Sequence, residues 1–195
     1  NGLESNGQDI ADNVAKQYGI EVMFSNANML QPAELRKMVD DAVAKFGKID
    51  VLVNNAGIQH VSPIEDFPEE KWNAIIGINL TSAFHLTKAV WKGMKERKFG
   101  RIINIASAHG LVASEFKSAY IASKHGIVGF TKTIALEGAP FGITANAICP
   151  GYVKTPLVEK QIADQAKAHN MSESDVVSKV MLLKQAVKDF VSVEE

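Results

Sequence analysis

The sequence Ile49-Asp50-Val51-Leu52-Val53-Asn54-Asn55-Ala56-Gly57 decides the fold class. It joins a short apolar run, typical of a buried β-strand, to small residues that let a flat ligand approach the backbone. Its paired amides are suited to linking neighbouring strands, although Asn and Gly also commonly mark an ordinary turn. Three further runs have the strand pattern, namely Glu21–Phe24, Arg101–Ala106 and Ile143–Cys149.

Longer segments of helical period separate these runs. We predict helices at Pro32–Phe46, Glu69–Arg97 and Ser118–Glu137, the first opening on a proline and the third followed by Gly138. Strands that alternate with helices pair in parallel, because parallel neighbours need long crossover connections. The sequence therefore predicts an α/β fold, a doubly wound parallel sheet in a single domain. Ligands of such sheets bind beyond the carboxyl ends of the strands, here after residues 54, 106 and 149.

Composition and charge exclude several classes of protein. The 195 residues are 46% hydrophobic, with 21 Lys+Arg against 22 Asp+Glu, which is ordinary for one globular domain. A formal net charge of -1 gives no electrostatic footprint for nucleic acid or an anionic membrane, and no apolar run is long enough to span a bilayer. The single cysteine, Cys149, excludes an internal disulfide and predicts a reducing, cytoplasmic environment. No metal is expected, because His60, His109 and His125 lack metal-ligand spacing.

The segment that follows the Arg101–Ala106 run carries reactive side chains. Ser107 comes directly after it, and Tyr120 and Lys124 are spaced i,i+4, so that both lie on one helix face. An ammonium beside a phenol favours the phenolate, so we expect Lys124 to lower the pKa of Tyr120. Tyr120 would then exchange a proton with a substrate oxygen near neutral pH, while Ser107 hydrogen-bonds the same oxygen. Taken alone, this spacing also occurs by chance on many helices.

Five features occur in one order along the chain. They are Asn54-Asn55-Ala56-Gly57, Asn79 inside a predicted helix, Ser107, Tyr120 with Lys124, and Pro150-Gly151 after the last strand. With these features the whole chain resembles the short-chain dehydrogenase/reductase family, which implies a Rossmann-like, nicotinamide-dependent oxidoreductase. The resemblance implies catalytic roles for Asn79, Ser107, Tyr120 and Lys124, with Asn79 holding a proton-relay water and Lys124 binding the nicotinamide ribose. The family's Gly-rich first βα unit and its last strand are missing, so we expect the domain at 1–195 to be incomplete at both ends.

The resemblance also implies where the cofactor binds. The expected cofactor-binding residues are Leu3, Asn28, Asn55, Ala56, Gly57, Tyr120, Lys124, Pro150, Gly151, Val153 and Thr155. No Arg or Lys near Leu3 is available to hold a 2′-phosphate, which favours NAD over NADP. Because the family commonly forms tetramers through long helices, Glu69–Arg97 and Ser118–Glu137 are the expected contacts of a homotetramer.

A closer resemblance, at residues 55–60, 105–114 and 155–162, is to bacterial members of the family that oxidise D-3-hydroxybutyrate to acetoacetate with NAD. It implies a small hydroxy acid as substrate. Its carboxylate would be bound by residues matching Gln59, His109, Lys117 and Gln161, and its apolar part would pack on Tyr152, where those enzymes usually have Trp. Taken alone, Lys117 is equally consistent with a solvated surface lysine.

The segment after Thr155 predicts two more helices, Pro156–His169 and Ser172–Lys188. They form either a peripheral helix pair or, as the resemblance favours, a lid at 156–188 that delivers Gln161 and excludes water on closure. Two alternatives to the hydroxybutyrate activity stay open. One is a short-chain reductase of another hydroxy or keto substrate, and the other is a truncated, non-catalytic binding module.

Overall fold

The structure is a computed structural model that describes residues 6–194. In chain order, its main elements are α1 Gly7–Tyr18, α2 Pro32–Phe46, β1 Val51–Asn54, α3 Glu69–Ile76, α4 Ser82–Arg97, β2 Gly100–Ile105, α5 Ser118–Gly138, β3 Ile143–Ile148, α6 Pro156–His169 and α7 Glu173–Val176. Two π-helical turns, Gly77–Thr81 and Val177–Met181, follow α3 and α7, and single 3-10 turns occupy Ala108–Gly110 and Ala139–Phe141.

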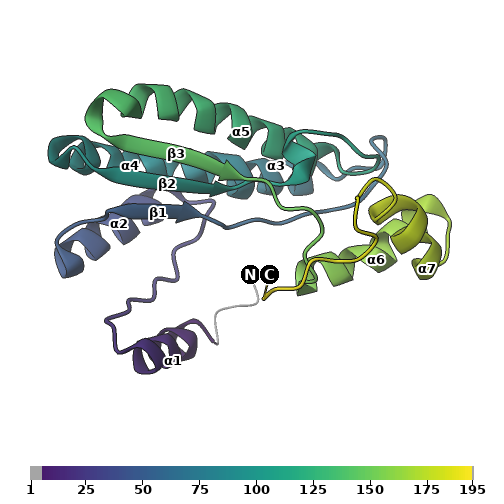
Figure 1. Ribbon diagram of the computed structural model, residues 1–195, viewed down its shortest axis with the longest axis horizontal. Coiled ribbons are helices and arrows are strands. Elements are labelled where there is room, and N and C mark those ends of the chain that lie inside the picture. The colour runs from purple at the N-terminus through teal and green to yellow at the C-terminus, as the bar shows by residue number, and fades with distance from the viewer. Residues whose placement is uncertain (1–5, 195) are drawn as a thin grey trace.

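The three strands form one parallel sheet in the order β1-β2-β3 (Figure 1). Asn54 of β1 pairs with Asn104 of β2, and Ile105 pairs with Ile148 of β3, so the strands end together at one edge. Helices α3 and α4 connect β1 to β2, and α5 connects β2 to β3. The predicted parallel α/β arrangement is therefore confirmed.

Helices α2, α4 and α5 share one hydrophobic core with the sheet. The buried residues of this core are Leu35, Val39, Leu86, Val90, Met94, Ile102, Ile134, Ile143 and Ala145. Alternate residues of β2 and β3 point into it, as the two-residue period of a strand requires. Each buried aliphatic side chain contributes about 1.5–3 kcal/mol, so this layer holds firmly the strands whose ends carry the candidate site.

The predicted strand at Glu21–Phe24 is wrong, because residues 20–28 have no regular structure. A strand is stable only when a neighbour completes its backbone hydrogen bonds. Within residues 6–194, β1 pairs with β2 alone, and no strand pairs with Glu21–Phe24. The local apolar pattern was therefore insufficient to define this element.

Three helical segments also differ from the expectation. Helix α1 was not predicted, and Ala11 is its one buried residue. Figure 1 shows this helix lying apart from the sheet. The expected helix Glu69–Arg97 is continuous but contains the π-helical turn at Gly77–Thr81. The expected helix Ser172–Lys188 begins as predicted, since Ser172 Oγ accepts a hydrogen bond from the Asp175 N–H at 3.1 Å, but helical structure ends at Met181. No helix within residues 6–194 is long and apolar enough to cross a membrane.

Candidate active site

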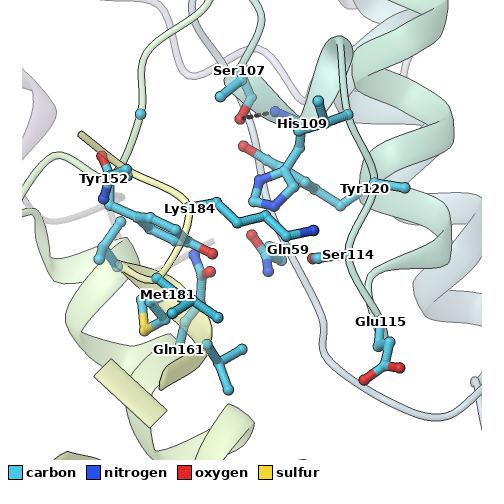
Figure 2. Close-up of a pocket in the computed structure, with 18 of the residues that line it drawn as sticks. Gln59, Ser107, His109, Ser114, Glu115, Tyr120, Tyr152, Gln161, Met181 and Lys184 are labelled. Atoms are coloured by element: carbon cyan, nitrogen blue, oxygen red, sulfur yellow. Dashed lines mark hydrogen bonds between the residues drawn. The ribbon is translucent and has the colours of Figure 1, made fainter. Parts of the chain in front are cut away.

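A cavity of about 830 Å³ lies between the carboxyl ends of β2 and β3 and the region of α6 and α7 (Figure 2). Many of the predicted site residues line it, namely Gln59, Ser107, His109, Tyr120, Pro150, Gly151, Tyr152 and Gln161. Ser107 follows β2 and Pro150 follows β3, so the cavity is placed where a parallel sheet offers a ligand site.

Ser107 and Tyr120 meet at one wall of this cavity. Ser107 Oγ accepts a hydrogen bond from the His109 backbone N–H at 3.1 Å and also hydrogen-bonds the side chain of Tyr120. Gly110 allows the turn after β2 to lie directly on α5, because a Cβ there would come within 2.7 Å of the Lys124 carbonyl oxygen. The two hydroxyl groups are therefore presented together by a strand end and a helix that are in close contact.

Tyr120 and Lys124 share one face of α5, with Lys124 Nζ 5.5 Å from the centroid of the Tyr120 ring. The predicted lowering of the tyrosine pKa is nevertheless wrong. Burial raises the pKa of Tyr120, and the hydrogen bond to Ser107 opposes this only in part. The Lys124 ammonium donates to the Ile105 carbonyl at 2.7 Å, and burial lowers the pKa of Lys124 to about 8. The i,i+4 spacing predicted proximity correctly, but the cost of removing a phenolate from water dominates.

Asn79 lies in the π-helical turn and is 4% exposed. Its Oδ1 accepts from the Ile58 N–H at 2.9 Å, and its Nδ2 donates to the Ile58 carbonyl at 3.0 Å and to Ser123 Oγ at 3.2 Å. Both side-chain donors are therefore used within the protein, and the amide holds the segment between Gly57 and Gln59 against α5. The proton-relay water at Asn79 stays a prediction.

Lys117 is 1% exposed, so its interpretation as a solvated surface lysine is wrong. Its Nζ donates to Tyr152 Oη at 3.0 Å and to Gln161 Oε1 at 3.4 Å, and lies 5.1 Å from the centroid of the Tyr152 ring. Burial lowers the pKa of Lys117 to about 8. The structure thus brings three predicted substrate residues together, but Tyr152 and Gln161 line the cavity and Lys117 does not.

The other two predicted substrate residues are polar and uncharged near neutral pH. The His109 ring lies between two tyrosines, with centroids 6.3 Å from Tyr120 and 5.9 Å from Tyr152. Burial, together with the charge on Lys117 and His125, lowers the pKa of His109 to about 4. Gln59 faces the cavity in Figure 2, and its Nε2 is buried with no hydrogen-bond partner among residues 6–194. A buried donor without a partner costs about 1–3 kcal/mol, which a ligand acceptor at this position would recover.

The residues predicted to bind the cofactor divide into two groups. Asn55, Ala56 and Gly57 are exposed at the end of β1, and a Cβ on Gly57 would lie 3.9 Å from Lys124 Nζ. The small side chains therefore leave open space beside the buried ammonium. Below them, Asn54 Nδ2 donates to Asn104 Oδ1 at 2.8 Å, which confirms the expected amide link between neighbouring strands.

The remaining residues lie in two places, the segment after β3 and the turn before α2. Pro150 and Gly151 line the cavity, whereas Val153 pairs with Val191 in a backbone bridge. Thr155 caps α6 by accepting a hydrogen bond from the Val158 N–H at 3.4 Å, and Asn28 Oδ1 accepts from the Leu30 N–H at 2.9 Å in the turn before α2. Leu3 lies outside the described residues. No group of three or more His, Cys, Asp or Glu side chains suited to a metal ion occurs within residues 6–194.

The sequence profile described as short chain dehydrogenase matches residues 3–166. The chain belongs to this family. This short chain dehydrogenase is 53% identical over 186 residues to a Rhizobium meliloti (strain 1021) protein named D-beta-hydroxybutyrate dehydrogenase, covering 95% of this chain and 72% of that protein. It is 55% identical over 177 residues to a protein of the same name from Cupriavidus necator (strain H16), covering 91% of this chain and 69% of that protein.

Two solved structures have the same fold as this short chain dehydrogenase. NAD+-bound xylitol dehydrogenase superposes with a TM-score of 0.89 at 31% identity, covering 96% of this chain and 74% of that chain. A single-residue variant of actinorhodin polyketide ketoreductase with NADPH superposes with a TM-score of 0.88 at 34% identity, covering 97% of this chain and 72% of that chain. The family binds a nicotinamide cofactor, and the exposed small residues beside Lys124 fit such a group. The Lys124 ammonium has no carboxylate partner among residues 6–194, which leaves it able to donate to ribose hydroxyls.

Sequence reasoning missed two contributions to this short chain dehydrogenase's cavity. Gln165 is 1% exposed on α6 and lies close enough to Tyr152 to influence the pKa of its phenol, with its Nε2 buried and without a hydrogen-bond partner among residues 6–194. Its i,i+4 spacing from Gln161 was the signal that could have found it. Lys184 lines the cavity from the segment after α7, and no sequence signal pointed to it because that segment was expected to be helical.

Proposed function

We propose that the chain catalyses the NAD-dependent oxidation of D-3-hydroxybutyrate to acetoacetate and the reverse reduction. The observation that carries this proposal is one cavity shared by the Ser107–Tyr120 hydroxyl pair and the polar side chains of Gln59, His109 and Gln161. The first group can act on an alcohol or ketone, and the second can bind a carboxylate. The two relatives named D-beta-hydroxybutyrate dehydrogenase support the same substrate.

Tyr120 is the proton-transfer group in this reaction. In the oxidising direction its phenolate takes the proton of the substrate hydroxyl, while Ser107 donates a hydrogen bond to the same oxygen as the carbonyl forms. The nicotinamide cofactor, when bound, supplies the acceptor of the hydride. In the reverse direction the protonated phenol gives its proton to the ketone oxygen, and its raised pKa keeps it protonated near neutral pH.

Lys124 and Asn79 prepare this group. The Lys124 ammonium lies 5.5 Å from the centroid of the Tyr120 ring, on the same face of α5, and it is placed to hold the cofactor ribose. Asn79 fixes the Gly57–Gln59 segment, which borders both the cofactor side and the cavity. The adenosine side would use Leu3, Asn28, Asn55, Ala56 and Gly57, and the nicotinamide side Pro150, Gly151, Val153 and Thr155.

The substrate carboxylate would bind at the Gln59, His109 and Gln161 side of the cavity. Gln59 Nε2 is a donor without a partner, and neutral His109 supplies a ring N–H. Lys117 lies behind Gln161 and Tyr152 and contributes positive charge to this end, with no carboxylate partner of its own within residues 6–194. We further propose that residues 156–188 act as a lid, since α6 delivers Gln161 to this end.

We also propose NAD as the cofactor and a homotetramer as the assembly. The sequence from Asn1 to Ala15 contains no arginine or lysine to neutralise a 2′-phosphate. On α4 and α5, Phe84 is 44% exposed and Leu136 is 79% exposed, and a groove of about 550 Å³ runs between these helices. Exposed apolar side chains of this kind are typical of subunit contacts, and sedimentation velocity of the purified protein tests the tetramer.

NADH absorbance tests the activity directly. The purified protein should form NADH from NAD and D-3-hydroxybutyrate, more slowly or not at all from the L enantiomer, and with NAD preferred to NADP. Protein that binds NADH but turns over neither D-3-hydroxybutyrate nor acetoacetate would refute the proposal and favour a binding module. Turnover confined to other keto substrates would favour a different short-chain reductase.

A further inference from the structure

Lys184 reaches into the cavity from the segment that follows α7. Figure 2 shows its side chain extending across the cavity toward the wall that carries Gln59 and Ser114. The turn that carries Lys184 is held by Lys188, whose Nζ donates to the Leu183 carbonyl at 2.6 Å and also bonds the carbonyls of Leu182 and Gln185. The ammonium of Lys184 is therefore presented by a backbone that is fixed in place.

Lys179, the other lysine that lines the cavity, is already paired. Lys179 Nζ lies 2.9 Å from Asp175 Oδ1, and Glu115 Oε2 lies 3.9 Å from His169 Nδ1. Lys184 has no acidic partner and no hydrogen bond within residues 6–194. Among the described cavity-lining residues, it is thus the unpaired cation.

The lysine expected to bind the substrate carboxylate is less accessible than Lys184. Lys117 is 1% exposed, and its Nζ is engaged by Tyr152 and Gln161. An anion that enters the cavity can therefore contact Lys184 directly. Lys117 attracts the anion only at a distance, unless Tyr152 and Gln161 rearrange to expose its ammonium.

We propose that Lys184 is a specificity-determining residue that binds the carboxylate of the substrate through a charge-assisted hydrogen bond. This inference rests on the proposed oxidation of a hydroxy acid, and it adds a second cation to the carboxylate-binding end. A direct contact between an ammonium and a carboxylate is stronger than one between neutral groups. Lys184 therefore selects acids over uncharged alcohols of the same length.

The test compares Lys184→Gln with wild type on an acid and on its uncharged ester. Glutamine keeps the polarity and approximate length but removes the charge. We expect the KM for D-3-hydroxybutyrate to rise about tenfold, with kcat and the KM for NAD unchanged, and the KM for ethyl D-3-hydroxybutyrate to stay constant. Lys167→Gln is the matched control, because Lys167 is an exposed α6 lysine that does not line the cavity, and its KM values should equal those of wild type.

Equilibrium binding separates this inference from the proposed reaction. Calorimetric titration with butyrate, which lacks the reacting hydroxyl, measures carboxylate binding without turnover, and Lys184→Gln should bind it about tenfold more weakly than wild type. Turnover of D-3-hydroxybutyrate with the same KM in Lys184→Gln and wild type would overturn the inference while the proposed reaction stands. An equal rise in KM for the acid and for the ester would also overturn it, since a structural defect does not distinguish the two substrates.

Discussion

Replacement of Lys117 by methionine tests whether a charged ammonium is buried beside the cavity. Burial lowers the pKa of this 1% exposed lysine from 10.5 to about 8. At about 1.4 kcal/mol for each pKa unit, the folded protein loses about 3 kcal/mol of stability by keeping the lysine protonated. Methionine has nearly the same length and no charge, so it removes this cost.

The effect of the substitution depends on pH in a defined direction. Below about pH 8 the folded and unfolded states both hold the proton, and wild type carries the whole cost. Between about pH 8 and pH 10.5 the unfolded state binds more protons than the folded state, so the stability of wild type rises with pH. Methionine does not titrate, and the advantage of Lys117→Met over wild type should therefore shrink by about 2–3 kcal/mol between about pH 7 and about pH 10.

Guanidinium chloride unfolding at these two pH values measures the change. Lost hydrogen bonds to Tyr152 and Gln161 lower the stability of Lys117→Met at both pH values by about the same amount, so they cancel in the comparison. Burial of Lys124 makes the free energy of unfolding rise with pH in the same way in both proteins, so this contribution also cancels. Lys167→Met, at an exposed position of α6, should show no pH-dependent difference. A difference between Lys117→Met and wild type that is equal at both pH values would refute the buried ammonium.

Three further outcomes follow from the site. Tyr120→Phe should lower kcat by about a hundredfold or more, while the dissociation constant for NADH, measured by fluorescence, stays unchanged because only the proton-transfer hydroxyl is lost. Since burial raises the pKa of Tyr120, alcohol oxidation should accelerate from about pH 7 to about pH 9 and ketone reduction should not; initial rates that are flat over this range would contradict the assigned base. Asn104→Ala removes a fully buried amide that bonds Asn54 and Thr131 at 2.8 Å each, and should lower the free energy of unfolding by about 2 kcal/mol; a loss below about 0.5 kcal/mol would show that the strands do not depend on this link.

Local sequence signals predicted those elements whose ends are determined locally. Helices α2 and α6 match the expectation from end to end, because each opens on a proline and stops at a residue with positive φ, Gly47 or Asn170. The segment Glu21–Phe24 has an equally good strand pattern but depends on a neighbouring strand. A pattern of a few residues contains no information about whether that neighbour is present.

The candidate site follows the same division. The order of motifs predicted that Ser107 and Tyr120 would meet. Ser107 lies just after the end of β2, and Tyr120 lies in the first turn of α5, the helix that follows. The direction of the Tyr120 pKa depends instead on how much water surrounds the phenol, which spacing along a helix does not determine. Burial of Lys117 could not be predicted for the same reason, because Tyr152 and Gln161 cover it from elements distant in sequence.

The two walls of the cavity differ in how they are held, and this assigns different tasks to them. The wall with Ser107 and Tyr120 is fixed by buried amides, since Asn79 secures the Ile58 segment and Asn104 links β1 to α5. The opposite wall, from α6 to the residues after α7, contacts the first through Lys117, which bonds Tyr152 and Gln161, and through the ring contacts of His109 with Tyr152 and of Phe116 with His169. Proton transfer requires sub-ångström placement, so it belongs on the fixed wall. Substitutions on the wall that carries Gln161 and Lys184 can then change the substrate with the chemistry left intact, whereas substitutions of Gln59 or His109 act on the fixed wall itself.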